Sequence, residues 1–162
     1  MRTVTFPSTN ESELYDRLCA HRRTFDAVGA ALLDASRQDV MDAYDEYTAG
    51  DTWRLVSALP ADPVAVPLKA NYVTLRSGAL KEVGAELLSR SSLCCLCALR
   101  DTSELDHYLP KEDFPEFAAL SLNLVPACSV CNGKKARNYR DTAGGQLFVH
   151  AYFDDLPDSL LF

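Results

Sequence analysis

Two pairs of cysteines constrain the fold of this chain more than any other feature of its sequence. Cys94 with Cys97, and Cys128 with Cys131, each enclose two residues. A Cys-x-x-Cys turn directs two thiolates to one ion, and two such turns complete the tetrahedral sulfur site that Zn²⁺ prefers. Because four protein ligands leave no open position, we expect a structural zinc that joins the two ends of the segment 94–131.

The remaining cysteines and the compartment bear on this interpretation. Two motifs at this spacing favour zinc over a redox centre, which needs only one motif in a βαβ setting, and over buried packing cysteines. Cys95 is an alternative ligand, although the two-residue spacing favours Cys94, and Cys19 is expected to pack in the core. The first eleven residues lack the apolar stretch of a secretory signal. We therefore expect a cytoplasmic, reducing location, in which such cysteines bind metal more often than they form disulfides.

The first ninety residues have the apolar periodicity of a helical region. Asn10 and Glu13 have the spacing of a helix-capping pair, and apolar residues follow at helical intervals. A second helix is expected to end at Gly50, a residue suited to the backbone conformation beyond a helix C-terminus. Further amphipathic stretches follow a proline-containing linker over residues 61–66. We therefore expect residues 1–90 to form a helical scaffold that docks a partner.

The chain changes character at Ser91, where it becomes rich in cysteine, proline and asparagine. Between the cysteine pairs it carries Asp106-His107 followed by Pro110. Asn123 then begins the run Asn-Leu-Val-Pro-Ala-Cys, and Asn132 stands in the run Cys-Asn-Gly-Lys-Lys. In their order and spacing these residues resemble the HNH endonucleases, in the branch whose ββα-metal finger is supported by zinc. Asn132 stands where many members have histidine, a variant that the family tolerates.

The resemblance covers residues 94–140 and implies an α+β fold. A mainly helical N-terminal region would precede a ββα-metal HNH finger, held by the four-cysteine zinc site and spanning residues 91–145. The finger would consist of strands near 105–109 and 122–125 and a helix over 130–139. Residues 146–162 are expected to form a C-terminal strand and tail, because β-forming side chains gather there.

The resemblance also implies metal-dependent hydrolysis of DNA, which leaves 5′-phosphate and 3′-hydroxyl ends. His107 would be the general base, since a neutral imidazole can take a proton from water near pH 7. Asp106 and Asn132 would bind the catalytic Mg²⁺ or Mn²⁺ through oxygen atoms, which are the ligands that hard cations prefer. Asn123 would hydrogen-bond the backbone of the loop that carries His107.

Four basic residues are expected to bind the phosphates of the substrate: Lys111, Lys134, Lys135 and Arg137. On the predicted helix Lys135 lies three positions after Asn132, so it would point toward the phosphate beside the metal. Asp106 and His107 are neighbours, and a regular strand would direct them to opposite faces. We therefore expect them to lie at a distorted strand end.

Charge bears on the partners of the protein. The net charge of the 162 residues is −7, but residues 94–140 carry equal numbers of acidic and basic side chains, so the acidity lies in the flanking regions. We expect DNA as the substrate, with weak unaided binding, and a protein partner such as a sensor or an ATPase docked on the helical region. Proteins of this kind often belong to bacterial defence systems or mobile elements. No apolar run is long enough for a membrane span. The alternative is a non-catalytic zinc finger that binds nucleic acid or a protein.

Overall fold

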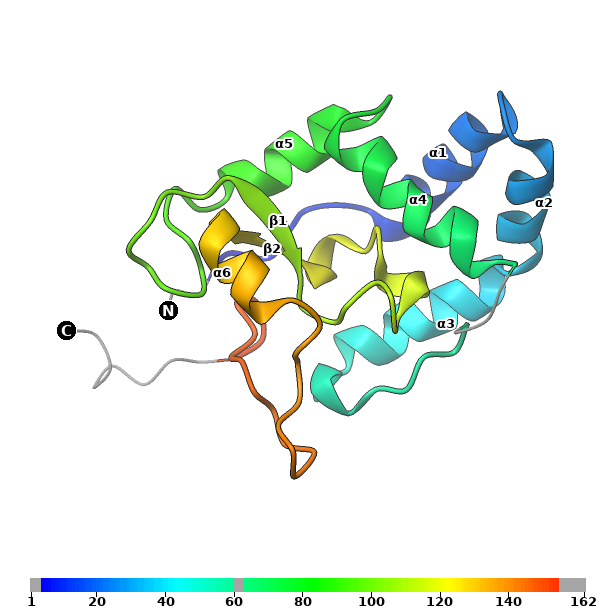
Figure 1. Ribbon diagram of the computed structural model, residues 1–162. Helices are drawn as coiled ribbons and strands as arrows, with labels where there is room; N and C mark the ends of the chain where they lie inside the picture. Colours follow the sequence, from blue (N-terminus) through cyan, green and yellow to red (C-terminus); the bar gives the residue numbers. More distant parts are fainter. Residues whose placement is uncertain (1–3, 60–62, 155–162) are drawn as a thin grey trace.

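The computed structural model describes residues 4–59 and 63–154. Its architecture is α+β, mostly helical, with one small two-stranded sheet (Figure 1). The helices are α1 Glu11–Arg23, α2 Ala27–Ala35, α3 Arg37–Thr48, α4 Ala65–Arg76, α5 Lys81–Ser89 and α6 Ser129–Lys135, the 3₁₀ turns are η1 Thr52–Arg54, η2 Pro115–Phe117 and η3 Ser121–Asn123, and the strands are β1 Glu104–His107 and β2 Leu124–Ala127. No helix within the described residues has the length and apolar character needed to cross a bilayer.

The helix boundaries follow from capping residues that the sequence predicts. The side chain of Asn10 accepts a hydrogen bond from the backbone N–H of Glu13 at 3.1 Å, which satisfies one of the free N–H groups at the start of α1. Gly50 follows the end of α3 with a φ of +102°, a conformation that glycine adopts without strain. Both predicted helix ends are thereby confirmed.

The linker predicted over residues 61–66 is shorter than expected at its C-terminal side, because α4 already begins at Ala65. Pro67 lies in the first turn of that helix, where its missing N–H would have had no intrahelical partner. Residues 61 and 62 of this prediction lie outside the described part of the chain.

The sheet consists of β1 and β2 in antiparallel pairing, with Asp106 opposite Val125 and His107 opposite Leu124. Both strands lie within one or two residues of their predicted positions. Helix α6 packs against β1 but is shorter than predicted. It stops at Lys135 because Ala136 adopts a left-handed φ of 47°, which breaks the helical path.

The C-terminal strand expected within residues 146–162 is absent from residues 146–154, and the rest of that prediction lies outside the described residues. Gln146 forms only an isolated bridge with Arg140, and the chain that follows is irregular. Its backbone groups bond to loop backbone and to side chains instead of to a neighbouring strand: the N–H of Leu147 donates to the carbonyl oxygen of Tyr139 at 3.1 Å, and that of His150 to Asp154 Oδ2 at 2.6 Å. The β-forming side chains of this stretch serve packing, since Tyr152 is buried in the core.

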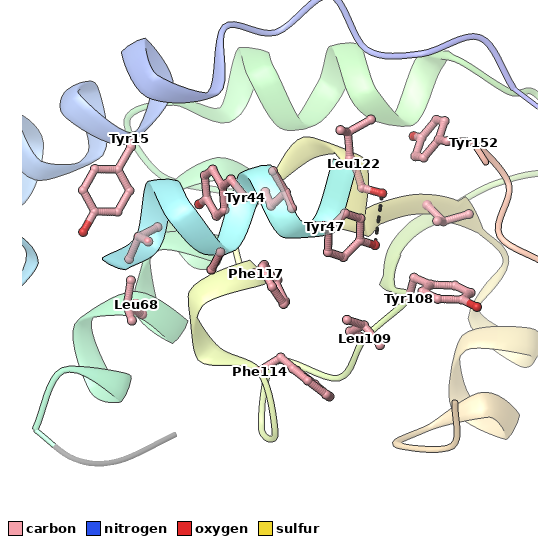
Figure 2. Packing of buried hydrophobic residues seen from close by; sticks show 14 of the residues in the cluster. Tyr15, Tyr44, Tyr47, Leu68, Tyr108, Leu109, Phe114, Phe117, Leu122 and Tyr152 are labelled. Atoms are coloured by element: carbon pink, nitrogen blue, oxygen red, sulfur yellow. Dashed lines mark hydrogen bonds between the residues drawn. The ribbon is translucent and has the colours of Figure 1, made fainter. Parts of the chain in front are cut away.

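The largest apolar cluster joins the helical region to the later part of the chain (Figure 2). Tyr47 of α3 packs its ring edge against Phe117, with ring centroids 4.9 Å apart, and Tyr108 and Tyr152 belong to the same cluster. A second cluster packs leucines of α1, α4 and α5 against the sheet through Leu105 and Leu124, among other residues. The sheet and the helices therefore share their core.

A buried polar contact also joins the two parts. The carboxylate of Glu11, at the start of α1, accepts hydrogen bonds from the backbone N–H and the hydroxyl of Ser121. Burial raises the pKa of Glu11 to about 7, although the bonds from Ser121 act in the opposite direction. The carboxyl group is therefore held where its charged form is disfavoured.

Candidate functional site

Four cysteine sulfurs converge at the base of the small sheet. The Sγ atoms of Cys94, Cys97, Cys128 and Cys131 all lie within 4.8 Å of one another. Tetrahedral zinc with Zn–S bonds of ~2.3 Å places its sulfurs ~3.8 Å apart, so the cluster fits that geometry with small adjustments. Cys95 packs instead in the main apolar cluster. Cys94, and not Cys95, therefore belongs to the four-cysteine cluster, which could bind a structural zinc.

The local backbone prepares these thiols for a cation. Cys128 caps α6, its sulfur accepting a hydrogen bond from the N–H of Cys131 at 3.5 Å, and this bond lowers the pKa of Cys128. Hydrogen bonds from the N–H groups of Leu99 and Arg100 lower the pKa of Cys97 to about 6. Burial and the neighbouring thiols raise the pKa of Cys131. Four thiolates in one place repel one another, and a divalent cation removes that cost.

A separate pocket of about 190 Å³ opens between α4, the end of β1 and α6. Three of the four residues predicted to act at the catalytic centre line it together, namely Asp106, His107 and Asn132. Asp106 and His107 are consecutive in β1, yet both reach the pocket because it lies at the end of the strand. The remaining lining residues are Tyr72, Leu105, Pro110, Lys111, Glu112, Ala136 and Arg137.

His107 is held in one tautomer. Its Nε2 lies 3.0 Å from the carbonyl oxygen of Ala118, and because a carbonyl can only accept, Nε2 carries the proton. Nδ1 has no hydrogen-bond partner in the described part of the chain. The ring packs edge-on against the ring of Tyr72, with the two ring centroids 4.4 Å apart. Burial, and then the charge of Lys111, lower the pKa of His107 to about 3, so the imidazole is neutral at pH 7 with a lone pair on Nδ1.

Asp106 forms a buried ion pair with Lys135. Lys135 Nζ lies 3.1 Å from Asp106 Oδ2 and also donates to the carbonyl oxygen of His107 at 2.6 Å. The side chains are 1% and 3% exposed for Lys135 and Asp106. Burial raises the pKa of Asp106 to about 6, against the opposing effect of Lys135. This position corrects the prediction for Lys135: it is not a surface contact for phosphate, because its ammonium group lies in the interior and neutralises the carboxylate.

Asn132 is tied to the opposite end of β1. Its Nδ2 donates to Glu104 Oε2 at 2.6 Å, so the amide oxygen keeps its lone pairs. Asp106 and Asn132 both line this pocket, and a carboxylate with an amide oxygen is a sparse but chemically suitable set for Mg²⁺ or Mn²⁺. The only group of three or more histidine, cysteine or acidic side chains suited to a metal among the described residues is the cysteine cluster.

Asn123 is fully buried and bonds to the loop that follows His107. Its Oδ1 accepts from the N–H of Leu109 at 2.8 Å, and its Nδ2 donates to the carbonyl oxygens of Leu109 and Phe117, each at 3.0 Å. The expected contact between Asn123 and the backbone near His107 is therefore present. The hydroxyl of Tyr47 lies 3.0 Å from Asn123 Oδ1 as well.

The other basic residues lie in different places. Lys111 lies at the pocket, with its Nζ 5.4 Å from the ring centroid of Tyr72. Arg137 also lines the pocket and forms an ion pair with Asp113. Lys134 is exposed outside this pocket, beside a separate apolar hollow. Only Lys111 and Arg137 are thus placed at the pocket mouth.

Sequence reasoning missed three residues around the site. Tyr72 of α4 packs edge-on against His107, although its only signal was its place in the apolar pattern of a helix. Tyr47 of α3 likewise looked like a core residue. His150 lies in the stretch that was expected to form a strand, but its side chain is 1% exposed and bonds to Tyr47. None of these contacts leaves a local signature in the sequence.

Comparisons found similarity to proteins of a phage and a bacterium. The chain is 36% identical to Protein ea31 of Escherichia phage lambda over 70 residues, which cover 42% of this chain and 23% of that protein. It is 38% identical to Septu protein PtuB of Bacillus thuringiensis over 53 residues, which cover 31% of this chain and 21% of that protein. The chain thus matches less than a quarter of the length of each of these relatives. No protein-family model matches it, and no solved structure does.

Proposed function

We propose that this chain is a metal-dependent endonuclease of the HNH type that hydrolyses phosphodiester bonds in DNA. One observation carries the proposal: His107, Asp106 and Asn132 line one pocket, and His107 is fixed with its proton on Nε2. This arrangement would combine a base with two oxygen ligands for a hard cation, the groups that metal-dependent hydrolysis of a phosphodiester uses.

His107 would act through Nδ1. Hydrolysis needs a base that accepts a proton from water as its oxygen attacks phosphorus. With Nε2–H held by the carbonyl oxygen of Ala118, the lone pair on Nδ1 is the only basic position on the ring. The low pKa keeps the imidazole neutral at rest, and the negative charge of a bound phosphate would raise it.

Asp106 and Asn132 would hold a Mg²⁺ or Mn²⁺ ion, which when bound stabilises charge on the phosphoryl oxygens and on the leaving 3′ oxygen. Lys135 Nζ lies 3.1 Å from Asp106 Oδ2 and 3.4 Å from Oδ1, but each carboxylate oxygen has a further lone pair, so Asp106 could contact Lys135 and a cation together. Lys111 and Arg137 at the pocket mouth would contact flanking phosphates. Lys135 would stabilise the site from within, without touching substrate.

The cysteine cluster would support this site through zinc. Cys128 caps α6, the helix that carries Asn132. The segment between the two cysteine pairs, residues 94–131, includes both strands. A zinc ion there would fix the helix against the sheet.

The similarity to a Septu protein and to a phage protein supports a defence or mobile-element setting for this chain. The net charge of −7 would weaken unaided binding to DNA, so we include in the proposal a protein partner on the helical region that brings the protein to its substrate.

A second function is favoured by the Lys135–Asp106 pair. The ammonium group of Lys135 already neutralises the carboxylate of Asp106. The pocket would therefore attract a divalent cation less strongly than it would if Asp106 were unpaired. The chain would then be a zinc-stabilised module that binds nucleic acid or a protein without cutting.

Cleavage of supercoiled plasmid by a His107→Ala variant separates the two functions. The proposal predicts that nicking in Mn²⁺ falls by about 100-fold or more, in line with the loss of a general base, while zinc content stays that of the parent. Thr102→Ala, which changes a residue outside the pocket, is the control and should cut as the parent does. Equal cutting by parent and His107→Ala would show that His107 is not the base.

A further inference from the structure

A chain of buried hydrogen bonds begins at His150. The backbone N–H of Tyr152 donates to His150 Nδ1 at 3.2 Å. Burial lowers the pKa of His150 to about 3, so the ring is neutral, and a neutral ring that accepts at Nδ1 carries its proton at Nε2. His150 Nε2 therefore donates to the hydroxyl oxygen of Tyr47, 2.9 Å away.

The direction of that bond decides the next one. Since the hydroxyl oxygen of Tyr47 accepts from His150, its own proton is available for Asn123 Oδ1 at 3.0 Å, with the carbonyl oxygen of Leu122 more distant at 3.4 Å. Figure 2 draws this longer contact between Tyr47 and Leu122. Every polar atom in the chain from Tyr152 to Asn123 thus has a partner, as buried polar networks require.

Asn123 forms hydrogen bonds to two backbone segments that contact or carry His107. It binds the N–H and the carbonyl of Leu109, two residues after His107. It also binds the carbonyl of Phe117, the residue before Ala118, whose carbonyl oxygen accepts from His107 Nε2. The strand end that carries the imidazole and the carbonyl that sets its tautomer are therefore fixed by one amide.

We propose that Tyr47 and His150 are positioning residues for His107 and act on it through Asn123. Tyr47 belongs to α3 and His150 to the stretch after residue 145, so neither lies in the segment 94–140 that holds His107 and Asn123. The site is then complete only when the helical region and the later stretch pack on this segment. The catalytic consequence rests on the proposed nuclease function, whereas the geometric one does not.

The chain offers a matched pair of variants. Tyr47→Phe keeps the ring that packs on Phe117 but removes the hydroxyl between His150 and Asn123. Tyr44→Phe removes a hydroxyl from another buried tyrosine of α3, which also packs on Phe117. The hydroxyl of Tyr44 makes no hydrogen bond within the described residues, so the second variant controls for a general effect on the core.

The first readout is plasmid nicking in Mn²⁺. We expect Tyr47→Phe to lower kcat by about 10- to 100-fold, the size of effect that a small misplacement of a reacting group produces. KM for DNA should stay within about twofold of the parent, because the residue touches no substrate. Tyr44→Phe should retain the kcat of the parent. An unchanged kcat in Tyr47→Phe, or an equal loss in both variants, overturns the proposal.

The second readout does not depend on cutting. Nitrogen-15 NMR of the His107 ring reports which nitrogen carries the proton. The parent and Tyr44→Phe should show a single Nε2–H form, and Tyr47→Phe a mixture of the two tautomers. Identical spectra for all three overturn the proposal. If the parent cuts no DNA, the nuclease function fails, and this spectrum alone decides whether Tyr47 positions the ring.

Two substitutions of His150 cover the case in which Tyr47→Phe does not fold. The side-chain amide of His150→Gln can still donate to Tyr47, whereas His150→Leu cannot. We expect the single Nε2–H form of His107 to persist in His150→Gln and to be lost in His150→Leu. If the single Nε2–H form persists in both variants, the inference is contradicted.

Discussion

Replacing Lys135 by methionine tests the buried ion pair at the centre of the site. The change keeps most of the length of the side chain but removes the ammonium group that lies 3.1 Å from Asp106 Oδ2 and 2.6 Å from the carbonyl oxygen of His107. Asp106, 3% exposed, would then keep a charge in the interior with no cation beside it.

The expected loss is large. Removing one partner of a buried ion pair costs about 3–5 kcal/mol, because the other charge remains buried without compensation. Such a loss is a substantial part of the total of about 5–15 kcal/mol that stabilises a protein of this size. We therefore expect Lys135→Met to lower the free energy of unfolding by about 3–5 kcal/mol.

Urea unfolding followed by circular dichroism, with zinc present, measures this loss. The neighbouring Lys134→Met is the control, because Lys134 is exposed and its removal should change the free energy by no more than about 0.5 kcal/mol. Adding Asp106→Asn to Lys135→Met should recover part of the loss, since no buried charge is then left unpaired. A cost for Lys135→Met no larger than that of the control would refute the buried pair.

Three further results are expected. Cys131→Ala should reduce bound zinc, measured by inductively coupled plasma mass spectrometry, whereas Cys95→Ala should leave one zinc per chain. An equal effect of both substitutions on the zinc content would contradict the assignment of the ligands. The folded-state pKa of Glu11, about 7, lies above its usual value of 4.5, so the contribution of Glu11 to stability is largest below pH 4.5 and is lost, by at most about 3 kcal/mol, as the pH rises from 4.5 through 7. Glu11→Gln should therefore reduce the fall of the melting temperature between pH 5 and pH 7, and an unchanged pH dependence would argue against a buried carboxyl. Gly84→Ala should destabilise the protein in urea, because the added Cβ would lie 2.2 Å from a backbone oxygen of α4. Gly133→Ala in α6, where the space around the added Cβ is open, should be neutral or stabilising by up to about 1 kcal/mol. The reverse order of stability would show that α4 and α5 are not closely packed.

The cysteine spacing was the most informative part of the sequence. It placed Cys94 and not Cys95 in the cluster, because two intervening residues allow two sulfurs to face one point from one turn. Capping residues were informative for the same reason: the contact of Asn10 with Glu13 lies within one turn of chain. Local rules succeed where the contacts themselves are local.

The burial of Lys135 could not be predicted in this way. Its helical spacing from Asn132 suggested a shared face toward substrate, but α6 ends at Lys135, and the side chain turns into the interior toward β1. The partner that accounts for its burial, Asp106, lies 29 residues earlier in the chain. Only the packing of α6 on the sheet brings the two together.

The same limit applies to the surroundings of His107. Tyr47, Tyr72 and His150 come from segments far apart in the sequence and looked like ordinary core or strand residues. Their contacts with the site depend on how α3, α4 and the stretch after residue 145 pack around the strand end. The β-forming residues near His150 were misinterpreted because no neighbouring strand is present in the described part of the chain for them to pair with.

The ends that the protein leaves on DNA test most directly whether it is a nuclease. Supercoiled plasmid is incubated with the zinc-loaded parent, with and without Mn²⁺, and the products are treated with DNA ligase. We predict nicked circles only when Mn²⁺ is present, with 5′-phosphate and 3′-hydroxyl ends that ligase reseals. Plasmid that is bound but remains intact in Mn²⁺ would contradict the nuclease and favour the binding module.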